Sequence, residues 1–235
     1  MGCGQSNQPV NWRRIRGIVF DVDGTLYDAY KLRRRLLREL LGYYLLRPWK
    51  VQDVRILRDF RYVRELRCND TPSDLESAQY VWTSEMCGAS PERVHQVVQE
   101  WIFRRPLRHL AACRYPGLLE LIVELDRREI KTAFFSDYPA KEKLAALGLS
   151  PCPAFCATDI NVNRLKPDPK SLLLAAQVLG VPVSDCLCIG DRDDRDGEAA
   201  RRAGMEYLLL KRNRSRSKKT FQSYFQLIDE IRLMN

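Results

Sequence analysis

The chain lacks the features that mark secreted, membrane-spanning or zinc-binding proteins. No apolar run approaches the ~18 residues that a transmembrane helix needs, and the N-terminus has no apolar signal-peptide core. The eight cysteines include no Cys-x-x-Cys pair, which disfavours a zinc site. Unpaired cysteines are typical of a reducing compartment, so we expect a cytoplasmic protein without a transmembrane segment.

Acidic residues are fewer than basic ones. The net charge is +9, from 39 lysines and arginines against 30 aspartates and glutamates. The excess gathers at 33–67 and at 211–219. A positive field attracts phosphate esters, but no zinc-finger or RNA-binding signature accompanies it. We therefore predict solvated, arginine-rich surfaces and no specific nucleic-acid partner.

The N-terminus carries one short pattern of its own. Met-Gly-Cys-Gly-Gln-Ser at 1–6 fits the N-myristoylation pattern, with Gly2 as the acceptor. A frayed terminus is the alternative, and we favour it because the pattern is so short. The sequence leaves the modification of Gly2 open.

Apolar runs alternate with helical patterns along most of the chain. The runs that predict buried strands are 17–20, 130–135, 154–157, 186–189 and 206–210. The helical patterns that separate most of them are 118–128, 140–146, 170–179 and 198–202. This alternation predicts an α/β fold, in which a parallel sheet has right-handed crossovers and helices on both faces.

Four short motifs follow or flank these predicted strands. They are Asp-Val-Asp-Gly-Thr at 21–25, Ser136, Lys-Pro-Asp-Pro at 166–169, and Gly-Asp at 190–191 followed by Asp196. Ligands of open α/β sheets bind beyond the carboxyl ends of the strands, so the motifs are expected to converge there. Each motif alone is weak, because a turn after a strand often has this composition.

Together and in this order, the four motifs resemble the haloacid dehalogenase-like (HAD) superfamily, specifically its phosphatase branch. The resemblance covers about 15–210 and implies a Rossmann-like parallel sheet core with an inserted α-helical cap. We expect the core domain at 1–28 and 116–235, and the cap domain at 29–115.

The resemblance implies distinct roles for the two carboxylates of the first motif. Asp21 would be the nucleophile that forms an aspartyl-phosphate. Asp23, two residues further along an extended chain and so pointing the same way, would be the general acid/base. Thr25 can tie the turn that Gly24 allows, and we also expect it to bind the substrate phosphate.

Ser136, Asp137 and Lys166 complete the expected phosphate site. The Ser136 hydroxyl and the Asp137 backbone N–H would hold a phosphoryl oxygen. The family usually has Asn or another neutral residue at the position of Asp137, so the side chain of Asp137 has no assigned role. Lys166, in a loop stiffened by prolines, would place its ammonium beside the nucleophile and the transferred group. The alternatives are a strand-end hydroxyl and a solvated lysine.

Carboxylates are dense at 190–197. Hard oxygen ligands in this number favour Mg²⁺. The resemblance implies four metal ligands: Asp21, Asp23, Asp191 and Asp196. Asp193 and Asp194 have no assigned role, and Arg192 and Arg195 would neutralise them. A calcium loop is disfavoured because its glutamate at position twelve and its flanking helices are absent.

The segment between the first two motifs has helical periodicity. It opens with an apolar stripe that we expect to face a core: Leu36, Leu37, Leu40, Leu41, Tyr44 and Leu45. Further helices are expected at about 50–67, from Ser73 with a capping box to Glu76, and from Ser90. A final stripe predicts a C-terminal helix docked on the core: Phe221, Phe225, Ile228 and Ile231.

The resemblance implies that this cap closes over the site and supplies substrate selectivity. Arginines at 55–67 would favour a substrate with a second anionic group, because a guanidinium meets carboxylate or phosphate in two bonds. We expect most of these arginines to belong to the solvated face of a helix.

The sequence therefore predicts a Mg²⁺-dependent phosphomonoester hydrolase for a small phosphorylated metabolite. One alternative is a sugar-phosphate mutase or other phosphotransferase of the same superfamily, which differs in the group that accepts the phosphoryl. Another is a nonenzymatic binding protein that uses its basic surface. A dehalogenase is disfavoured because ester hydrolysis needs the acid/base chemistry of Asp23 and dehalogenation does not.

Overall fold

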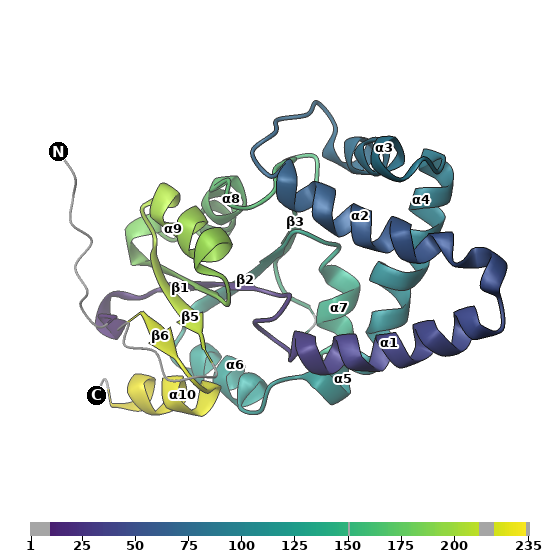
Figure 1. Cartoon of the computed structure of the whole chain (residues 1–235). Helices are drawn as coiled ribbons and strands as arrows, with labels where there is room; N and C mark the ends of the chain where they lie inside the picture. Colours follow the sequence, from purple (N-terminus) through teal and green to yellow (C-terminus); the bar gives the residue numbers. More distant parts are fainter. Residues whose placement is uncertain (1–9, 150, 212–218, 234–235) are drawn as a thin grey trace.

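A six-stranded parallel sheet forms the centre of the molecule, in the order β3-β2-β1-β4-β5-β6 (Figure 1). The structure is a computed structural model and describes residues 10–149, 151–211 and 219–233. The strands are β1 (Gly17–Asp21), β2 (Lys131–Ser136), β3 (Ala154–Cys156), β4 (Cys186–Gly190), β5 (Glu206–Leu210) and β6 (Thr220–Phe221). All five predicted strands form and the α/β fold is confirmed, while β6 is additional.

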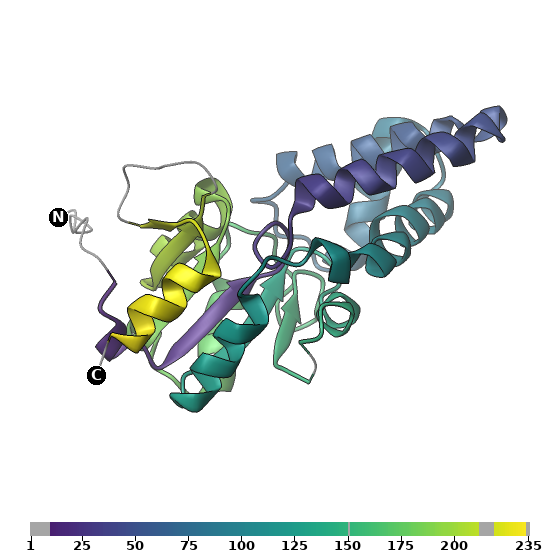
Figure 2. The ribbon, with the colours of Figure 1, turned by 90° about the horizontal axis from the view of Figure 1, so that it is seen from below.

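Helices cover both faces of the sheet, as predicted. They are α6 (Leu118–Arg127), α7 (Lys141–Ala146), α8 (Lys170–Leu179), α9 (Glu198–Ala203) and α10 (Tyr224–Arg232). Ile18 and Phe20 of β1 share a core with α6, α7 and α10, whereas Val19 shares one with α8 and α9. Figure 2 shows α10 and α6 side by side on the first face. Because β1 is buried on both faces, its sequence is a continuous apolar run.

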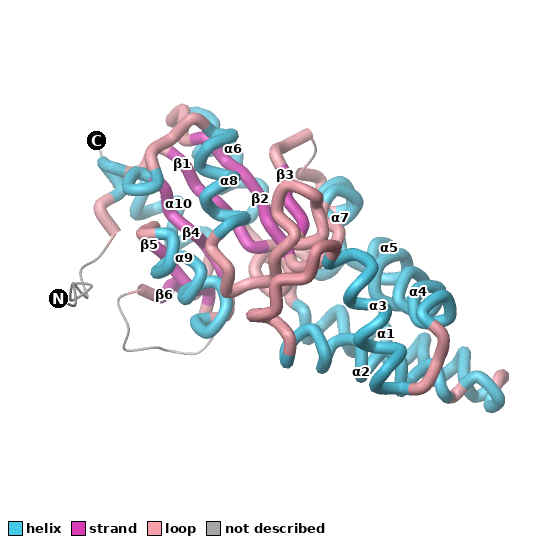
Figure 3. The backbone as a smooth tube through the Cα atoms, turned by 90° about the horizontal axis from the view of Figure 1, so that it is seen from above, coloured by secondary structure: helices cyan, strands magenta, loops and turns pink. Residues whose placement is uncertain are grey.

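The chain between β1 and α6 forms a helical bundle beside the sheet (Figure 3). Its helices are α1 (Ala29–Leu45), α2 (Gln52–Leu66), α3 (Leu75–Cys87), α4 (Pro91–Val98), a π-helical segment (Gln99–Arg104) and α5 (Arg105–Cys113). Tyr44, Phe60 and Trp101 belong to an apolar core of its own. This bundle lies where the cap is predicted, and the domain boundaries at 29 and 115 stay a prediction. Shorter helical segments are Trp12–Arg14, Pro48–Lys50, Val183–Asp185 and Asp193–Gly197.

The apolar stripe of α1 is only half buried, which corrects one prediction. Leu40 and Tyr44 pack toward the bundle, but Leu37, Leu41 and Leu45 are 53%, 55% and 81% exposed. The two sets form separate i, i+4 rows on the helix. Because α1 packs against α5 along one side, only one row can be covered.

The start of α3 also differs from the prediction. Asp74, not Ser73, is the N-cap residue, and its carboxylate accepts a hydrogen bond from the Glu76 N–H at 3.0 Å. The Ser73 carbonyl instead accepts from the Asn163 side chain at 3.0 Å, which ties this loop to the core. The predicted start of α4 is confirmed, since the Ser90 hydroxyl accepts from the Arg93 N–H.

At the C-terminus, α10 docks on the sheet core as predicted, with a shifted apolar face. Tyr224, Leu227, Ile228 and Ile231 are buried, whereas Phe225 is 48% exposed. The difference arises because the helix begins only at Tyr224, after Phe221 has paired in β6.

No helix among the described residues is long and apolar enough to cross a membrane. The cysteines in the same part of the chain are all free. The N-myristoylation pattern at 1–6 and most of the basic stretch at 211–219 lie outside the described residues. The cytoplasmic location stays a prediction.

Candidate active site

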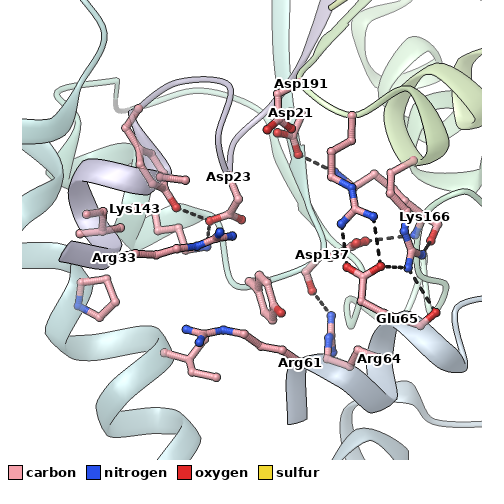
Figure 4. Close-up of a pocket in the computed structure, with 18 of the residues that line it drawn as sticks. Asp21, Asp23, Arg33, Arg61, Arg64, Glu65, Asp137, Lys143, Lys166 and Asp191 are labelled. Atoms are coloured by element: carbon pink, nitrogen blue, oxygen red, sulfur yellow. Dashed lines mark hydrogen bonds and ion pairs between the residues drawn. The ribbon is translucent and has the colours of Figure 1, made fainter. Parts of the chain in front are cut away.

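Segments far apart in the sequence meet at the carboxyl edge of the sheet (Figure 4). Asp21 ends β1, Ser136 ends β2 and Asp191 follows β4 directly, while Lys166 lies in the loop between β3 and α8. Asp21, Lys166 and Asp191 line a pocket of about 230 Å³ whose opposite wall comes from α1, α2 and the π-helical segment. The convergence that the parallel sheet predicts is therefore present.

Asp21 is only 1% exposed, and both oxygens of its carboxylate have partners. Lys166 Nζ donates to Oδ1, and the Thr25 hydroxyl donates to Oδ2 at 2.7 Å. Burial raises the pKa of Asp21, and nearby carboxylates add to the rise, while the Lys166 ammonium opposes it. The Thr25 hydroxyl therefore holds this carboxylate, and its predicted contact with the substrate phosphate stays a prediction.

Asp23 points away from Asp21 toward a different set of donors. The Ser136 hydroxyl donates to Oδ2 at 2.5 Å, while Lys143 Nζ, at 2.6 Å, and the Tyr27 hydroxyl donate to Oδ1. Burial raises the pKa of Asp23, but the charge and hydrogen bond of Lys143, together with the hydrogen bonds from Ser136 and Tyr27, lower it below the ordinary value. The sequence analysis missed Tyr27 and Lys143. The sequence offers only their positions as signals. Tyr27 lies four residues after Asp23, and Lys143 lies in the helix that follows Ser136.

Three carboxylates form a group that suits a hard cation. One oxygen from each of Asp21, Asp191 and Asp196 lies within 4.8 Å of the others. Burial, and then the nearby Asp196, raise the pKa of Asp191 to about 6. Three crowded carboxylates fit the oxygen-donor set that Mg²⁺ takes. The Asp23 carboxylate is not in this group, and its metal contact stays a prediction.

Hydrogen bonds to Asp196 close the loop after β4, and two glycines leave room for the carboxylates beside them. Asp196 Oδ2 accepts hydrogen bonds from the backbone N–H groups of Asp191, at 3.1 Å, and Arg192, at 3.0 Å, which closes the loop on itself. A Cβ at Gly190 would collide with the Asp196 side chain, and one at Gly24 would collide with Asp191 Oδ2. Glycine at both positions therefore lets the first and last motifs come together.

The side chain of Asp137, which had no assigned role, holds the Lys166 loop. Its Oδ1 accepts a hydrogen bond from the Lys166 backbone N–H at 3.0 Å. Arg195 donates to the Lys166 carbonyl from the other side. The Lys166 ammonium then contacts both Asp21 and Asp196, the latter at 2.8 Å. Asp137 and Arg195 thus fix the backbone that aims this ammonium.

The helical bundle and the loop after β4 are joined through Glu65 of α2, which the sequence analysis did not single out. Its carboxylate accepts from Arg195 and, at 2.7 Å, from Arg192. Burial raises the pKa of Glu65, but the hydrogen bonds from these arginines outweigh it and lower the value. Arg192 and Arg195 therefore do more than neutralise the loop: Arg192 also pairs with Asp194, whereas Asp193 pairs with Arg201.

The arginines of α2 divide into paired and unpaired groups. Arg55 and Arg58 pair with Asp59, and Arg67 lies beside cap carboxylates. Arg64 is 4% exposed and donates to the backbone carbonyl of Asp137. Arg61 lines the pocket, as does Arg33 of α1 (Figure 4).

Comparison with known proteins gives one family. The family model of the haloacid dehalogenase-like hydrolases matches residues 15–204. Among curated relatives, fructose-1-phosphate phosphatase YqaB of Escherichia coli is 30% identical over 205 residues, which cover 83% of this chain and 96% of that protein. N-Acetylmuramic acid 6-phosphate phosphatase of Pseudomonas aeruginosa is 29% identical, with 81% of this chain and 79% of that protein covered.

One relative is much longer than the match. SUPPRESSOR OF QUENCHING 1, a chloroplastic protein of Arabidopsis thaliana, is 26% identical over 86% of this chain, but the match spans only 18% of its own length.

Among solved structures, the HAD hydrolase YfnB of Bacillus subtilis, solved with magnesium bound, superposes with a TM-score of 0.67 at 15% identity. That superposition covers 93% of this chain and 99% of YfnB, and it shows a shared fold.

Proposed function

The chain belongs to the haloacid dehalogenase-like hydrolases, and on that basis we propose that it is a Mg²⁺-dependent phosphatase of small phosphomonoesters, with Asp21 as nucleophile and Asp23 as general acid/base. The observation that carries the proposal is the separation of two neighbouring carboxylates. Asp21 faces Lys166 and the acidic group, whereas Asp23 faces Ser136, Tyr27 and Lys143. Two carboxylates in different surroundings suit two different roles.

In the first step an oxygen of Asp21 forms a bond to phosphorus, and the bond from phosphorus to the ester oxygen breaks. Asp23 gives its proton to that leaving oxygen. A phosphoryl anion beside Asp23 favours the neutral, protonated form of its carboxyl, which counters the effect of Lys143. The product of this step is an aspartyl-phosphate and a free alcohol.

In the second step a water molecule loses a proton to Asp23 while its oxygen attacks phosphorus. The bond from phosphorus to the Asp21 oxygen breaks, which regenerates Asp21 and releases inorganic phosphate. Throughout, the Lys166 ammonium stabilises negative charge on the transferred group. A bound Mg²⁺, held by Asp21, Asp191 and Asp196, would add positive charge at the phosphoryl oxygens.

Substitution of Asp21 tests the nucleophile. Asp21→Asn keeps the size of the side chain but cannot form the anhydride, so kcat for p-nitrophenyl phosphate should fall by roughly a hundredfold or more. Acid-quenched wild type given ³²P-labelled substrate should carry protein-bound label, and the variant should carry none. An unchanged thermal melt serves as the control. A labelled, active Asp21→Asn protein would contradict the proposed role.

Two further measurements distinguish a phosphatase from a phosphotransferase and from a binding protein. One is the kinetics of Asp23→Asn, and the other is the amount of phosphate released. Asp23→Asn should lower kcat/KM more for alkyl phosphates than for p-nitrophenyl phosphate, whose leaving group needs no proton. A phosphatase releases one phosphate per alcohol, even when sugar phosphates are added as acceptors. A phosphotransferase would release less phosphate than alcohol under those conditions. A binding protein would turn over neither substrate.

A further inference from the structure

Most charged side chains around the pocket have a partner within the protein. Seven basic and six acidic side chains line it. The ion pairs among them are Lys143–Asp23, Lys166–Asp21, Lys166–Asp196, Arg192–Glu65 and Arg195–Glu65. Arg64 is held by Gln79 and by the Asp137 carbonyl. Arg33 and Arg61 alone among these basic residues make no hydrogen bond or ion pair with any residue that the structure describes.

The two unpaired arginines approach one space from different helices of the cap. Arg33 lies on α1 and Arg61 on α2. In Figure 4 both side chains reach toward the side of the pocket where Asp23 lies, whereas Arg64 turns the other way toward Asp137. Other residues that line the pocket near them are apolar: Leu32, Leu36, Ile102 and Pro106. The one carboxylate that α2 adds to the pocket, Glu65, pairs with Arg192 and Arg195, so it does not neutralise the two guanidinium groups.

We propose that Arg33 and Arg61 bind a second anionic group of the substrate, a carboxylate or a second phosphate. The proposal rests on the phosphatase function above, because it assigns the transferred phosphoryl group to Asp21 and Lys166. A planar guanidinium forms two parallel hydrogen bonds with either anion. The substrate class is then phosphomonoesters with two anionic ends, and Arg33 and Arg61 determine specificity without taking part in the chemistry.

Matched pairs of substrates test the class and distinguish the two anions. The carboxylate pair is 3-phosphoglycerate and glycerol 3-phosphate, which differ at one end only. The phosphate pair is fructose 1,6-bisphosphate and fructose 1-phosphate. In at least one pair, the wild-type kcat/KM should be tenfold or more higher for the member with the second anion. The pair that shows the preference identifies the anion.

Single substitutions assign the preference to the two arginines. Arg33→Gln and Arg61→Gln should each raise KM for the preferred substrate about tenfold, with kcat nearly unchanged. The member of the pair that lacks the second anionic group, and p-nitrophenyl phosphate, should change less than about twofold. Arg33→Lys keeps the charge but loses the planar fork, so its KM should lie between wild type and Arg33→Gln.

One exposed arginine on each helix provides a matched control. Arg34 of α1 lies over the Tyr30 ring, and Arg58 of α2 pairs with Asp59. Neither lines the pocket, so Arg34→Gln and Arg58→Gln remove the same charge without touching the proposed site. Both controls should retain the wild-type preference.

Two results would overturn the inference and leave the phosphatase function intact. One is a wild-type enzyme that hydrolyses p-nitrophenyl phosphate but shows no preference in either pair. The other is an equal loss for both members of a pair in Arg33→Gln and Arg61→Gln, which would assign the arginines to the transferred phosphoryl group. If the wild type hydrolyses no phosphomonoester at all, the proposed function itself fails, and the inference fails with it.

Discussion

At the scale of single residues, the surroundings of Asp21 and Asp23 shift their pKa values in opposite directions. Burial raises the pKa of Asp21, whereas Lys143, Ser136 and Tyr27 together outweigh burial and lower the pKa of Asp23. Both shifts oppose the proposed roles, which need an ionised nucleophile and a protonated acid. A cation beside Asp21 and a phosphoryl anion beside Asp23 would each reverse the shift at its own carboxylate. A bound cation and a bound phosphoryl group would thus favour, at each carboxylate, the protonation state that its proposed role needs.

Gly24 occupies a position that has no room for a side chain. Its φ is +93°, and a Cβ there would collide with the Asp191 carboxylate. Gly24→Ala should therefore destabilise the fold by roughly 1–3 kcal/mol and lower turnover of p-nitrophenyl phosphate. Urea unfolding and steady-state kinetics measure the two effects.

The control for Gly24→Ala is Gly42→Ala. Gly42 lies inside α1, and a Cβ there would meet no heavy atom within 4 Å. That substitution should stabilise the protein by roughly 0.5–1 kcal/mol, because alanine favours the helix. If both substitutions had the same effect, the close approach of Gly24 to Asp191 would not explain the result.

At the scale of elements, periodicity predicted the strands and helices but not how deeply each is buried. The apolar runs before Asp21, Ser136 and Asp191 predicted strands because parallel strands buried on both faces need continuous apolar sequence. Periodicity cannot tell which of two leucine rows of α1 is covered, since that depends on where α5 lies. The strand β6 is too short for any pattern, and only its pairing with β5 defines it.

The contact between α2 and the loop after β4 leads to a prediction for Glu65. Glu65→Gln removes the charge that holds Arg192 and Arg195, so the packing of α2 against the loop after β4 should become less favourable. A partly exposed pair contributes at most about 1 kcal/mol, so KM for p-nitrophenyl phosphate should rise by up to about fivefold. Raising the salt concentration should move the wild type toward the variant.

Glu85 supplies the matched control for Glu65. It pairs with Arg67 inside the cap and has no part in the contact with the core. Glu85→Gln should leave KM unchanged within error. Equal effects of the two substitutions would show that net charge, and not the contact between cap and core, controls binding.

At the scale of the whole molecule, the sequence predicted the residues that the sheet brings together but not those that the cap adds. The ends of parallel strands share one edge, so the order of strands and motifs along the chain was enough to place Asp21, Ser136 and Asp191 near each other. The pairing of Glu65 with Arg195 depends on how the bundle lies against the core, which no local pattern encodes. The same holds for the unpaired state of Arg33 and Arg61, because it depends on which carboxylates the fold places beside other arginines.

The acidic group makes the stability of the whole molecule depend on pH and on metal. The pKa of Asp191 in the folded protein is about 6, against about 3.9 for an unperturbed aspartate. Between these values the folded state holds a proton that the unfolded chain has lost, so the stability of EDTA-treated protein should fall as pH rises. Above pH 6 the full loss is on the order of 3 kcal/mol.

Asp191→Asn does not titrate, so in EDTA its melting temperature should exceed that of the wild type by a margin that grows from pH 5 to pH 7. At pH 7, Mg²⁺ at a hundred times its Kd should stabilise the wild type by about 2.7 kcal/mol, and it should stabilise Asp191→Asn much less. Asp193→Asn is the control from the same loop, because Asp193 pairs with Arg201 outside the acidic group. If Mg²⁺ raised the melting temperatures of the wild type and Asp191→Asn equally, the cation would bind elsewhere, and Asp191 would not be a ligand.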